Sequence, residues 1–113
     1  MKILDLPLKK KWYNMIESGV KREEYREIKP YWKKRLLFCY EAGGWCDECY
    51  CISCPARVEK MYSDYTHVRF RYGYTKRTML YELGAITIGK GKKEWGAPDY
   101  DVFILKLGER VDG

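Results

Sequence analysis

The sequence predicts a single small domain of the α+β class. Its 113 residues match the usual size of one domain, and a content of 46% hydrophobic and 34% charged residues is typical of a globular protein. One segment near the N-terminus has the apolar period of a helix, whereas segments after residue 67 alternate or run apolar as strands do. We find no repeat and no linker, so one domain is expected over residues 1–113.

The N-terminal helix is expected over residues 8–18. Four apolar residues form one stripe at helical spacing: Leu8, Trp12, Met15 and Ile16. Pro7 suits the first helical turn, and Gly19 suits the left-handed residue that ends a helix. Residues 21–27 then carry six charges in seven positions, which predicts an exposed strand or the wall of a polar cavity.

The middle of the chain has less regular patterns. Residues 31–35 predict a short helical turn that starts at Pro30, and the apolar residues 36–40 predict a buried strand. Residues 41–66 fit no period well and contain a cysteine cluster, so they are interpreted as an insertion, with a short helix over 56–62.

Strands dominate the C-terminal half. Residues 68–72 alternate with a period of two, which places Phe70 inside, and a turn follows at Gly73–Tyr74. Residues 78–88 predict a long strand that is bent or bulged at Gly84. A basic loop follows at 89–93, and the apolar residues 102–107 predict a central strand.

Charge and aromatic content favour a nucleic-acid partner. The net charge is +6, and the chain holds eleven Tyr and four Trp, so cations for phosphates accompany rings for stacking on bases. The alternative is that the tyrosines fill a β-rich core and the charge aids solubility. No apolar stretch approaches the roughly 18–20 residues of a membrane span, and no signal peptide is visible, so we expect a cytoplasmic protein with no membrane partner.

Several motifs, in this order, resemble the ASCH (activating-signal-cointegrator homology) family of PUA-like proteins: Gly19-Val20-Lys21, Glu24-Tyr25-Arg26, residues 68–74, Gly89-Lys90-Gly91, Glu94-Trp95-Gly96 and residues 103–108. The resemblance implies a PUA-like fold, which is a small, mixed, partly open β-barrel with helices packed at its openings and a polar cleft beside it. The N-terminal helix belongs to this pattern, whereas residues 41–66 form a Cys-rich insertion. The resemblance also implies binding of RNA or a modified nucleoside. In a family amidohydrolase that acts on acetylcytidine, Lys21 has a counterpart, but Glu24 stands where that enzyme has threonine. A carboxylate is a poor replacement for a hydroxyl nucleophile, so that activity is not transferred.

The cleft is predicted to contain Lys21, Glu24 and Arg26. Arg26 suits a bidentate contact with a phosphate or carboxylate, Lys21 adds a point charge, and Glu24 can accept from an exocyclic amine. Lys21 and Glu24 can meet only if the turn after Gly19 rotates Lys21 inward. The alternative is an exposed strand with weak ion pairs. In both cases Lys21→Ala and Arg26→Ala are expected to change stability by only about 0.5 kcal/mol, as at surface sites.

Two basic-aromatic segments, 31–35 and 69–77, supply further predicted ligand contacts: Trp32, Arg69, Arg71 and Tyr74. Together with Lys90–Lys93 they predict salt-sensitive binding of single-stranded RNA. The alternative places rings such as Trp32 in the core and leaves only the cations outside.

Cys46, Cys49, Cys51 and Cys54 form two C-x2-C pairs that are candidate ligands of a structural zinc ion. Only Tyr50 separates the pairs, so one pair with Cys39 or His67 is an alternative ligand set, and metal-free thiols are another. Three functions therefore stay open. They are binding of RNA or a nucleotide-like molecule, an enzyme (nuclease or amidohydrolase) acting in the same cleft, and a zinc-clipped protein interaction module.

Overall fold

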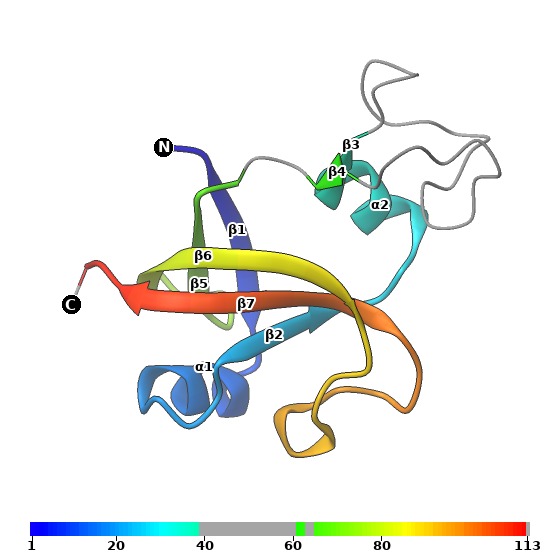
Figure 1. Cartoon of the computed structure of the whole chain (residues 1–113). Helices are drawn as coiled ribbons and strands as arrows, with labels where there is room; N and C mark the ends of the chain where they lie inside the picture. Colours follow the sequence, from blue (N-terminus) through cyan, green and yellow to red (C-terminus); the bar gives the residue numbers. More distant parts are fainter. Residues whose placement is uncertain (39–60, 63–64, 113) are drawn as a thin grey trace, which may run out of the picture. The chain divides into compact units, whose positions relative to one another are not determined.

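The computed structural model describes residues 1–38, 61–62 and 65–112. The chain divides into two compact units, one formed by Met1–Arg26 with Tyr65–Gly113 and the other by Glu27–Asp64. The first unit is a curled five-stranded sheet, a half-barrel, with helix α1 (Lys10–Glu17) packed on it (Figure 1). The α+β class is therefore confirmed, whereas one domain with an insertion at 41–66 stays a prediction.

The five-stranded sheet has the strand order β1–β5–β6–β7–β2. The strands have these bounds: β1 Ile3–Leu8, β2 Glu23–Arg26, β5 His67–Tyr72, β6 Thr78–Gly89 and β7 Val102–Arg110. β1 runs parallel to β5, and the other pairs are antiparallel. The strands predicted from residue 68 onward are confirmed, and the register shifts between Leu83 and Ala85 confirm the bulge at Gly84.

The N-terminal prediction needs a correction, because a strand precedes the helix. Pro7 and Leu8 belong to β1, in which Leu4, Leu6 and Leu8 are buried with a period of two. Pro7 is tolerated because β1 is an edge strand, where a missing N–H costs no ladder hydrogen bond. The helix is therefore shorter than the predicted 8–18, and it buries Tyr13 and Ile16.

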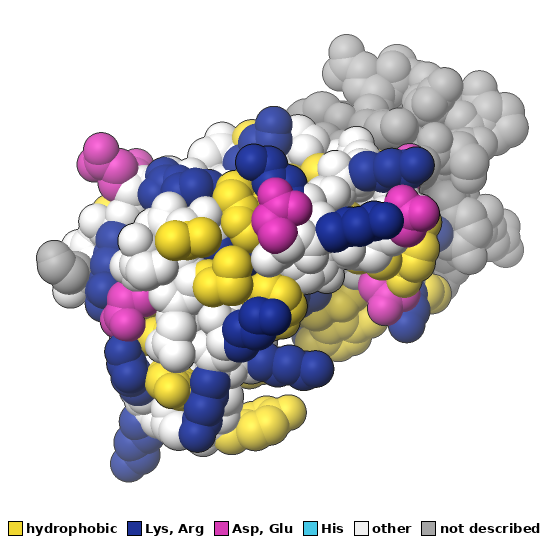
Figure 2. Space-filling view, turned by 90° about the horizontal axis from the view of Figure 1, so that it is seen from below, with side chains coloured by type: hydrophobic (Ala, Val, Ile, Leu, Met, Phe, Trp, Pro, Cys, Tyr) yellow, Lys and Arg dark blue, Asp and Glu magenta, His cyan; other side chains and the backbone are white. Residues whose placement is uncertain are grey.

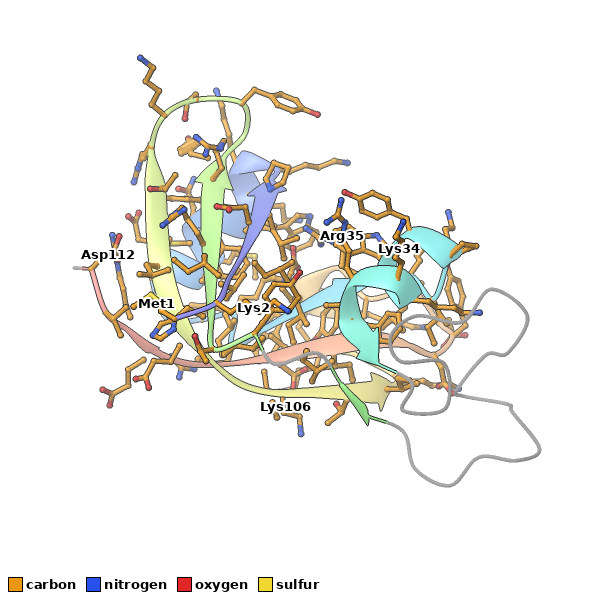
Figure 3. All side chains as sticks on the ribbon, turned by 90° about the horizontal axis from the view of Figure 1, so that it is seen from above. Met1, Lys2, Lys34, Arg35, Lys106 and Asp112 are labelled. Carbon is orange, nitrogen blue, oxygen red and sulfur yellow. The ribbon has the colours of Figure 1, made fainter. Side chains whose placement is uncertain are left out.

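β7 is the central strand that its apolar sequence predicts. It lies between β6 and β2, and its first four residues, Val102–Leu105, are all buried. Lys106 is exposed and points away from the sheet (Figure 3). Phe70 of β5 is also fully buried, so its predicted core position is confirmed.

The second unit contains helix α2 (Pro30–Leu36) and a two-stranded sheet of β3 (Leu37–Phe38) and β4 (Met61–Tyr62). The helical turn predicted at 31–35 is confirmed. The strand predicted over 36–40 is shifted, because Leu36 still belongs to α2, and its last two residues lie outside the described part. The helix predicted over 56–62 is wrong at 61–62, which pair as a strand. Among the described residues, no helix is long and apolar enough to cross a membrane.

Replacing residues 43–62 with a short Gly/Ser linker is expected to leave a cooperatively folding protein. The five-stranded sheet uses none of these residues in its hydrogen-bonded pairs. Changing the length of a connection costs only about 0.6 kcal/mol for each doubling. Thermal unfolding followed by circular dichroism measures this, and loss of the cooperative transition would contradict it.

Candidate functional site

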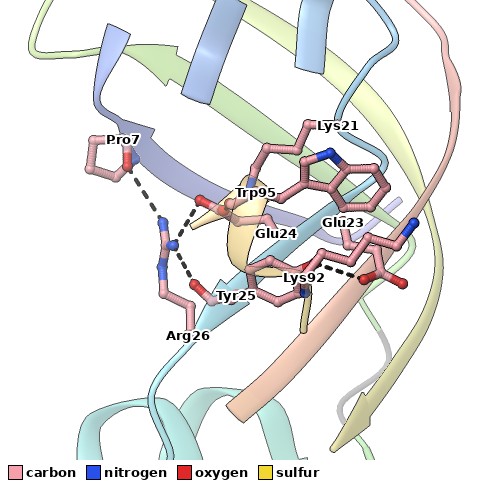
Figure 4. Close-up of polar contacts among 8 residues, drawn as sticks. All are labelled: Pro7, Lys21, Glu23, Glu24, Tyr25, Arg26, Lys92 and Trp95. Atoms are coloured by element: carbon pink, nitrogen blue, oxygen red, sulfur yellow. Dashed lines mark hydrogen bonds and ion pairs between the residues drawn. The ribbon is translucent and has the colours of Figure 1, made fainter. Parts of the chain in front are cut away.

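Lys21, Glu24 and Arg26 meet in one chain of ion pairs (Figure 4). Lys21 Nζ lies 3.1 Å from Glu24 Oε1, and Arg26 Nη1 lies 2.8 Å from Glu24 Oε2. The Glu24 carboxylate therefore bridges two cations. The three residues that the sequence predicts for one site do come together.

The turn after α1 brings Lys21 to Glu24. Gly19 has a φ of 86°, a left-handed conformation that favours glycine, and the Lys21 amide donates to the Met15 carbonyl at 3.0 Å. β2 begins only at Glu23, so Lys21 precedes the strand and escapes its alternation. The expected inward rotation of Lys21 is confirmed.

Two of these three side chains are more buried than the predicted stability effects, which are those of surface sites, assume. Lys21 is 1% exposed and Glu24 is 4% exposed, so the alternative of an exposed strand is wrong at both positions. Because Lys21 is buried, Lys21→Ala does not change a surface site, so the stability change of only about 0.5 kcal/mol no longer follows. Arg26 keeps 17% of its side chain exposed.

The ammonium group of Lys21 has an unusual environment. Besides Glu24 it donates to the Trp95 carbonyl, and it lies 5.0 Å from the centre of the Trp12 ring and 4.7 Å from that of Tyr25. Removal from water lowers the pKa of Lys21 below its usual value, and the Glu24 carboxylate opposes this shift. The site thus holds a buried cation between aromatic faces.

The segment between β6 and β7 covers Lys21. It contains the 3₁₀ helix η1 (Lys93–Trp95), and the Lys92 amide donates to the Tyr25 hydroxyl at 3.0 Å. A Cβ on Gly91 would lie 2.4 Å from the Tyr25 ring, and one on Gly96, whose φ is +96°, would lie 2.9 Å from the Trp12 ring. Glycine is therefore needed at both positions for this close approach.

Arg26 also connects the two edges of the sheet. Its Nη1 donates to the Tyr25 carbonyl at 2.7 Å, and its Nη2 donates to the Pro7 carbonyl of β1 at 3.5 Å (Figure 4). β1 and β2 are the edge strands of the five-stranded order. The curl of the sheet thus brings both edges to one guanidinium group.

Three of the other predicted ligand residues, Arg69, Arg71 and Tyr74, do not join this cluster. Arg69 pairs with Asp5 at 3.2 Å, and Arg71 donates to the Thr75 carbonyl at 3.0 Å, so both guanidinium groups are engaged near their own strand. Tyr74 lies in the turn after β5 and is 97% exposed, which excludes the core alternative. Trp32 belongs to α2 of the other unit, where it is half-buried.

Sequence reasoning missed the aromatic part of the site and the cations on α1. A basic surface is defined by four of the exposed cations that lie over aromatic rings: Lys10 and Arg77 over Tyr72, Lys11 over Trp12, and Lys92 over Trp95. Arg77, in the turn between β5 and β6, lies over the ring of Tyr13 in α1, and Gly96, in the segment between β6 and β7, closely approaches the Trp12 ring of α1. Dark-blue cations outnumber magenta carboxylates on the face of α1 and this loop (Figure 2). The sequence signal for this surface is Lys-Lys-Trp at 10–12, from which the sequence analysis predicts only a helix.

The predicted zinc ligands Cys46, Cys49, Cys51 and Cys54 lie outside the described residues, as does Cys39. Within residues 1–38, 61–62 and 65–112, no three His, Cys, Asp or Glu side chains are grouped so that they could hold a metal ion.

Comparisons with protein-family models, with curated proteins and with solved structures found no match to this chain.

Stability is expected to fall as the pH rises above 10. Burial raises the pKa of Tyr25 above its ordinary value of 10.0, and burial raises those of Tyr13 and Tyr81 in the same direction. The unfolded chain therefore loses these protons first, which favours unfolding. The lowered pKa of Lys21 has the opposite effect, because it makes stability rise with pH until the pH reaches the usual lysine pKa of 10.5. The three tyrosines are expected to outweigh this single lysine. Urea titrations at several alkaline pH values measure how steeply the free energy of unfolding falls with pH. This fall should be less steep in Tyr25→Phe.

Proposed function

We propose that the protein binds RNA or a modified nucleoside at the site formed by Lys21, Glu24 and Arg26, as its resemblance to ASCH and PUA-like proteins implies. The observation that carries the proposal is the enclosed ion-pair chain beside the Trp12 and Tyr25 rings. Buried ion pairs return little net stability, so their presence in so small a protein favours a functional role.

The groups of the site suit a nucleotide chemically. Lys21 is a donor and Glu24 an acceptor, 3.1 Å apart, and such a pair complements the edge of a base that carries an acceptor next to an amine. Arg26, which is partly exposed, suits a phosphate oxygen. Trp12, Tyr25 and Trp95 add aromatic faces on which a base can stack.

Substitution at the charged site is expected to weaken ligand binding. Glu24→Gln keeps the shape but removes the charge, and Arg26→Gln removes the phosphate contact. Each should weaken binding by about 1–3 kcal/mol, roughly 5- to 150-fold. Quenching of tryptophan fluorescence by a panel of nucleosides, modified nucleosides and short RNA oligomers measures this.

Arg69→Gln is the matched control, because Arg69 forms only an exposed pair with Asp5. Equal affinity of parent, Glu24→Gln and Arg26→Gln would contradict the proposed site. Absence of binding by every nucleoside and oligomer would contradict the function itself.

An enzyme acting on RNA or nucleosides is the second candidate. It is favoured by the lowered pKa of Lys21 beside a carboxylate, since such a lysine can take up a proton during a reaction. Turnover of the same panel, followed by chromatography, separates it from simple binding. Glu24→Gln would then lose turnover and keep most of its affinity. The zinc-clipped module and the cytoplasmic location remain predictions from the sequence.

A further inference from the structure

We propose that residues 90–97 form a lid over Lys21, and that a ligand enters by replacing the Trp95 carbonyl with an acceptor atom of its own. The ligand in this proposal rests on the proposed function, whereas the lid rests on the geometry of the loop alone. The lid contains η1 and the two close-packed glycines, Gly91 and Gly96.

The first argument is access. The Lys21 side chain is 0% exposed, and one of the two oxygens that it contacts is the Trp95 carbonyl of the lid. Glu24 supplies the other oxygen from β2, which is fixed in the sheet. No ligand can reach the ammonium group while the lid is closed, but displacement of the lid would free one of its bonds.

The second argument is the way in which the lid is attached. Its internal hydrogen bonds, such as Trp95 N–H to the Lys92 carbonyl and Gly96 N–H to the Lys93 carbonyl, can all persist while it moves as one body. Two polar contacts hold it to the sheet: Lys21 to the Trp95 carbonyl and the Lys92 amide to the Tyr25 hydroxyl. Packing adds to the attachment: Trp95 and Ala97 lie in the cluster around Tyr25, and the close-packed glycines Gly91 and Gly96 lie against the rings of Tyr25 and Trp12.

The third argument concerns the ligand. An ammonium group that loses a buried partner must regain one, because an unsatisfied buried charge is costly. A ligand that holds the lid open must therefore offer Lys21 an oxygen or nitrogen acceptor. A carbonyl or ring nitrogen of a nucleobase meets this requirement, and the rings of Trp12 and Tyr25, whose centres lie 5.0 and 4.7 Å from the ammonium group, offer aromatic contacts to its ring. A purely apolar ligand does not fit.

Lid opening can be measured without any ligand. The hydrogen bond from the Lys92 amide to the Tyr25 hydroxyl is the latch of the lid, and hydrogen exchange of this amide measures how often it opens. Acetylation by acetic anhydride, followed by mass spectrometry, measures access to the Lys21 ammonium group. In Gly96→Ala the new methyl group meets Trp12 at a strained φ, so the lid should open and Lys21 should react about tenfold faster. The Leu105 amide in β7 should keep the protection of the parent.

Gly73→Ala is the matched control. Gly73 also has a positive φ, +60°, but a Cβ there would meet nothing within 4 Å, so it adds strain away from the lid. Its Lys21 reactivity should equal that of the parent. The lid would be overturned if Lys21 is acetylated, and the Lys92 amide exchanges, only as fast as the Leu105 amide exchanges. Both sites would then open only when the whole protein unfolds.

Ligand exchange is tested by protection. A nucleoside that binds should slow acetylation of Lys21 in the parent and speed hydrogen exchange at Lys92, because it occupies the ammonium group while the latch is open. If the nucleoside slows both the acetylation of Lys21 and the hydrogen exchange of the Lys92 amide, the ligand does not replace the Trp95 carbonyl and this part of the proposal is overturned. A lid that opens while no nucleoside or oligomer changes either rate would support the lid and contradict the proposed function.

Discussion

Lys21→Ala is expected to lower the free energy of unfolding by about 3 kcal/mol, the low end for breaking a buried ion pair. The variant removes a side chain that is 0% exposed, together with its bonds to Glu24 and to the Trp95 carbonyl. Glu24 keeps Arg26 as a partner, which limits the cost. Urea and thermal denaturation measure it, with a decrease in Tm of roughly 12 °C for a protein of this size.

Two further variants make this test specific. Lys93→Ala removes a lysine whose side chain is 74% exposed, so it should change stability by no more than about 0.5 kcal/mol. Lys21→Met removes the ammonium group at similar volume and leaves Glu24 paired with Arg26, so it should recover part of the loss that the cavity left by Lys21→Ala adds. A Lys21→Ala protein as stable as the Lys93→Ala protein would show that the ammonium group is not buried in solution.

Affinity for single-stranded RNA is expected to fall about 20-fold between 50 and 200 mM salt if three lysines contact phosphates. Lys10, Lys11 and Lys92 of the basic surface are the lysines that we expect to contact phosphates, whereas Arg77 is already paired with Glu17 at 2.8 Å. Fluorescence anisotropy of a labelled oligouridylate at several salt concentrations gives the slope.

The double variant Lys10→Gln with Lys92→Gln should reduce the salt slope by about 1.4, since each phosphate contact contributes about 0.7. Lys106→Gln is the control, because Lys106 is exposed on β7 and outside the basic surface. An affinity that does not change with salt would restrict the proposed function to a small molecule at the charged site.

The fold could largely be predicted because its strands carry clear patterns. The alternation at 68–72 and the apolar run at 102–107 each have one simple structural meaning. The sequence analysis misses the strand at Ile3–Leu8 because Pro7 and Leu8 also suit the start of a helix, although Leu4, Leu6 and Leu8 alternate as in a strand. The parallel pairing with β5 establishes the strand. That pairing joins residues far apart in the sequence, so no local pattern reports it.

The sequence predicts which residues form the charged site but not how deeply they are buried. Lys21, Glu24 and Arg26 stand out as charges after a helix-ending glycine. Their burial depends on Trp12, Tyr25 and the Trp95 carbonyl, which come from three separate segments. Enclosure of a charge by such distant segments is a property of tertiary structure, so the sequence predicts a cleft but not the burial of its charges, and the stability effects it predicts are those of surface sites.

The parallel pairing of β1 with β5 has a consequence for folding during synthesis. Asp5 and Arg69, which pair across these strands, are 64 residues apart, whereas β5, β6 and β7 follow one another through short antiparallel connections. Local antiparallel pairs form fast and distant parallel pairs form slowly. β1 therefore leaves the ribosome before β5, β6 and β7, but it is among the last of these strands to find its partner. Until residue 72 has emerged, Leu4, Leu6 and Leu8 have no sheet to cover them, and the nascent chain is most exposed to aggregation or chaperone capture in this interval.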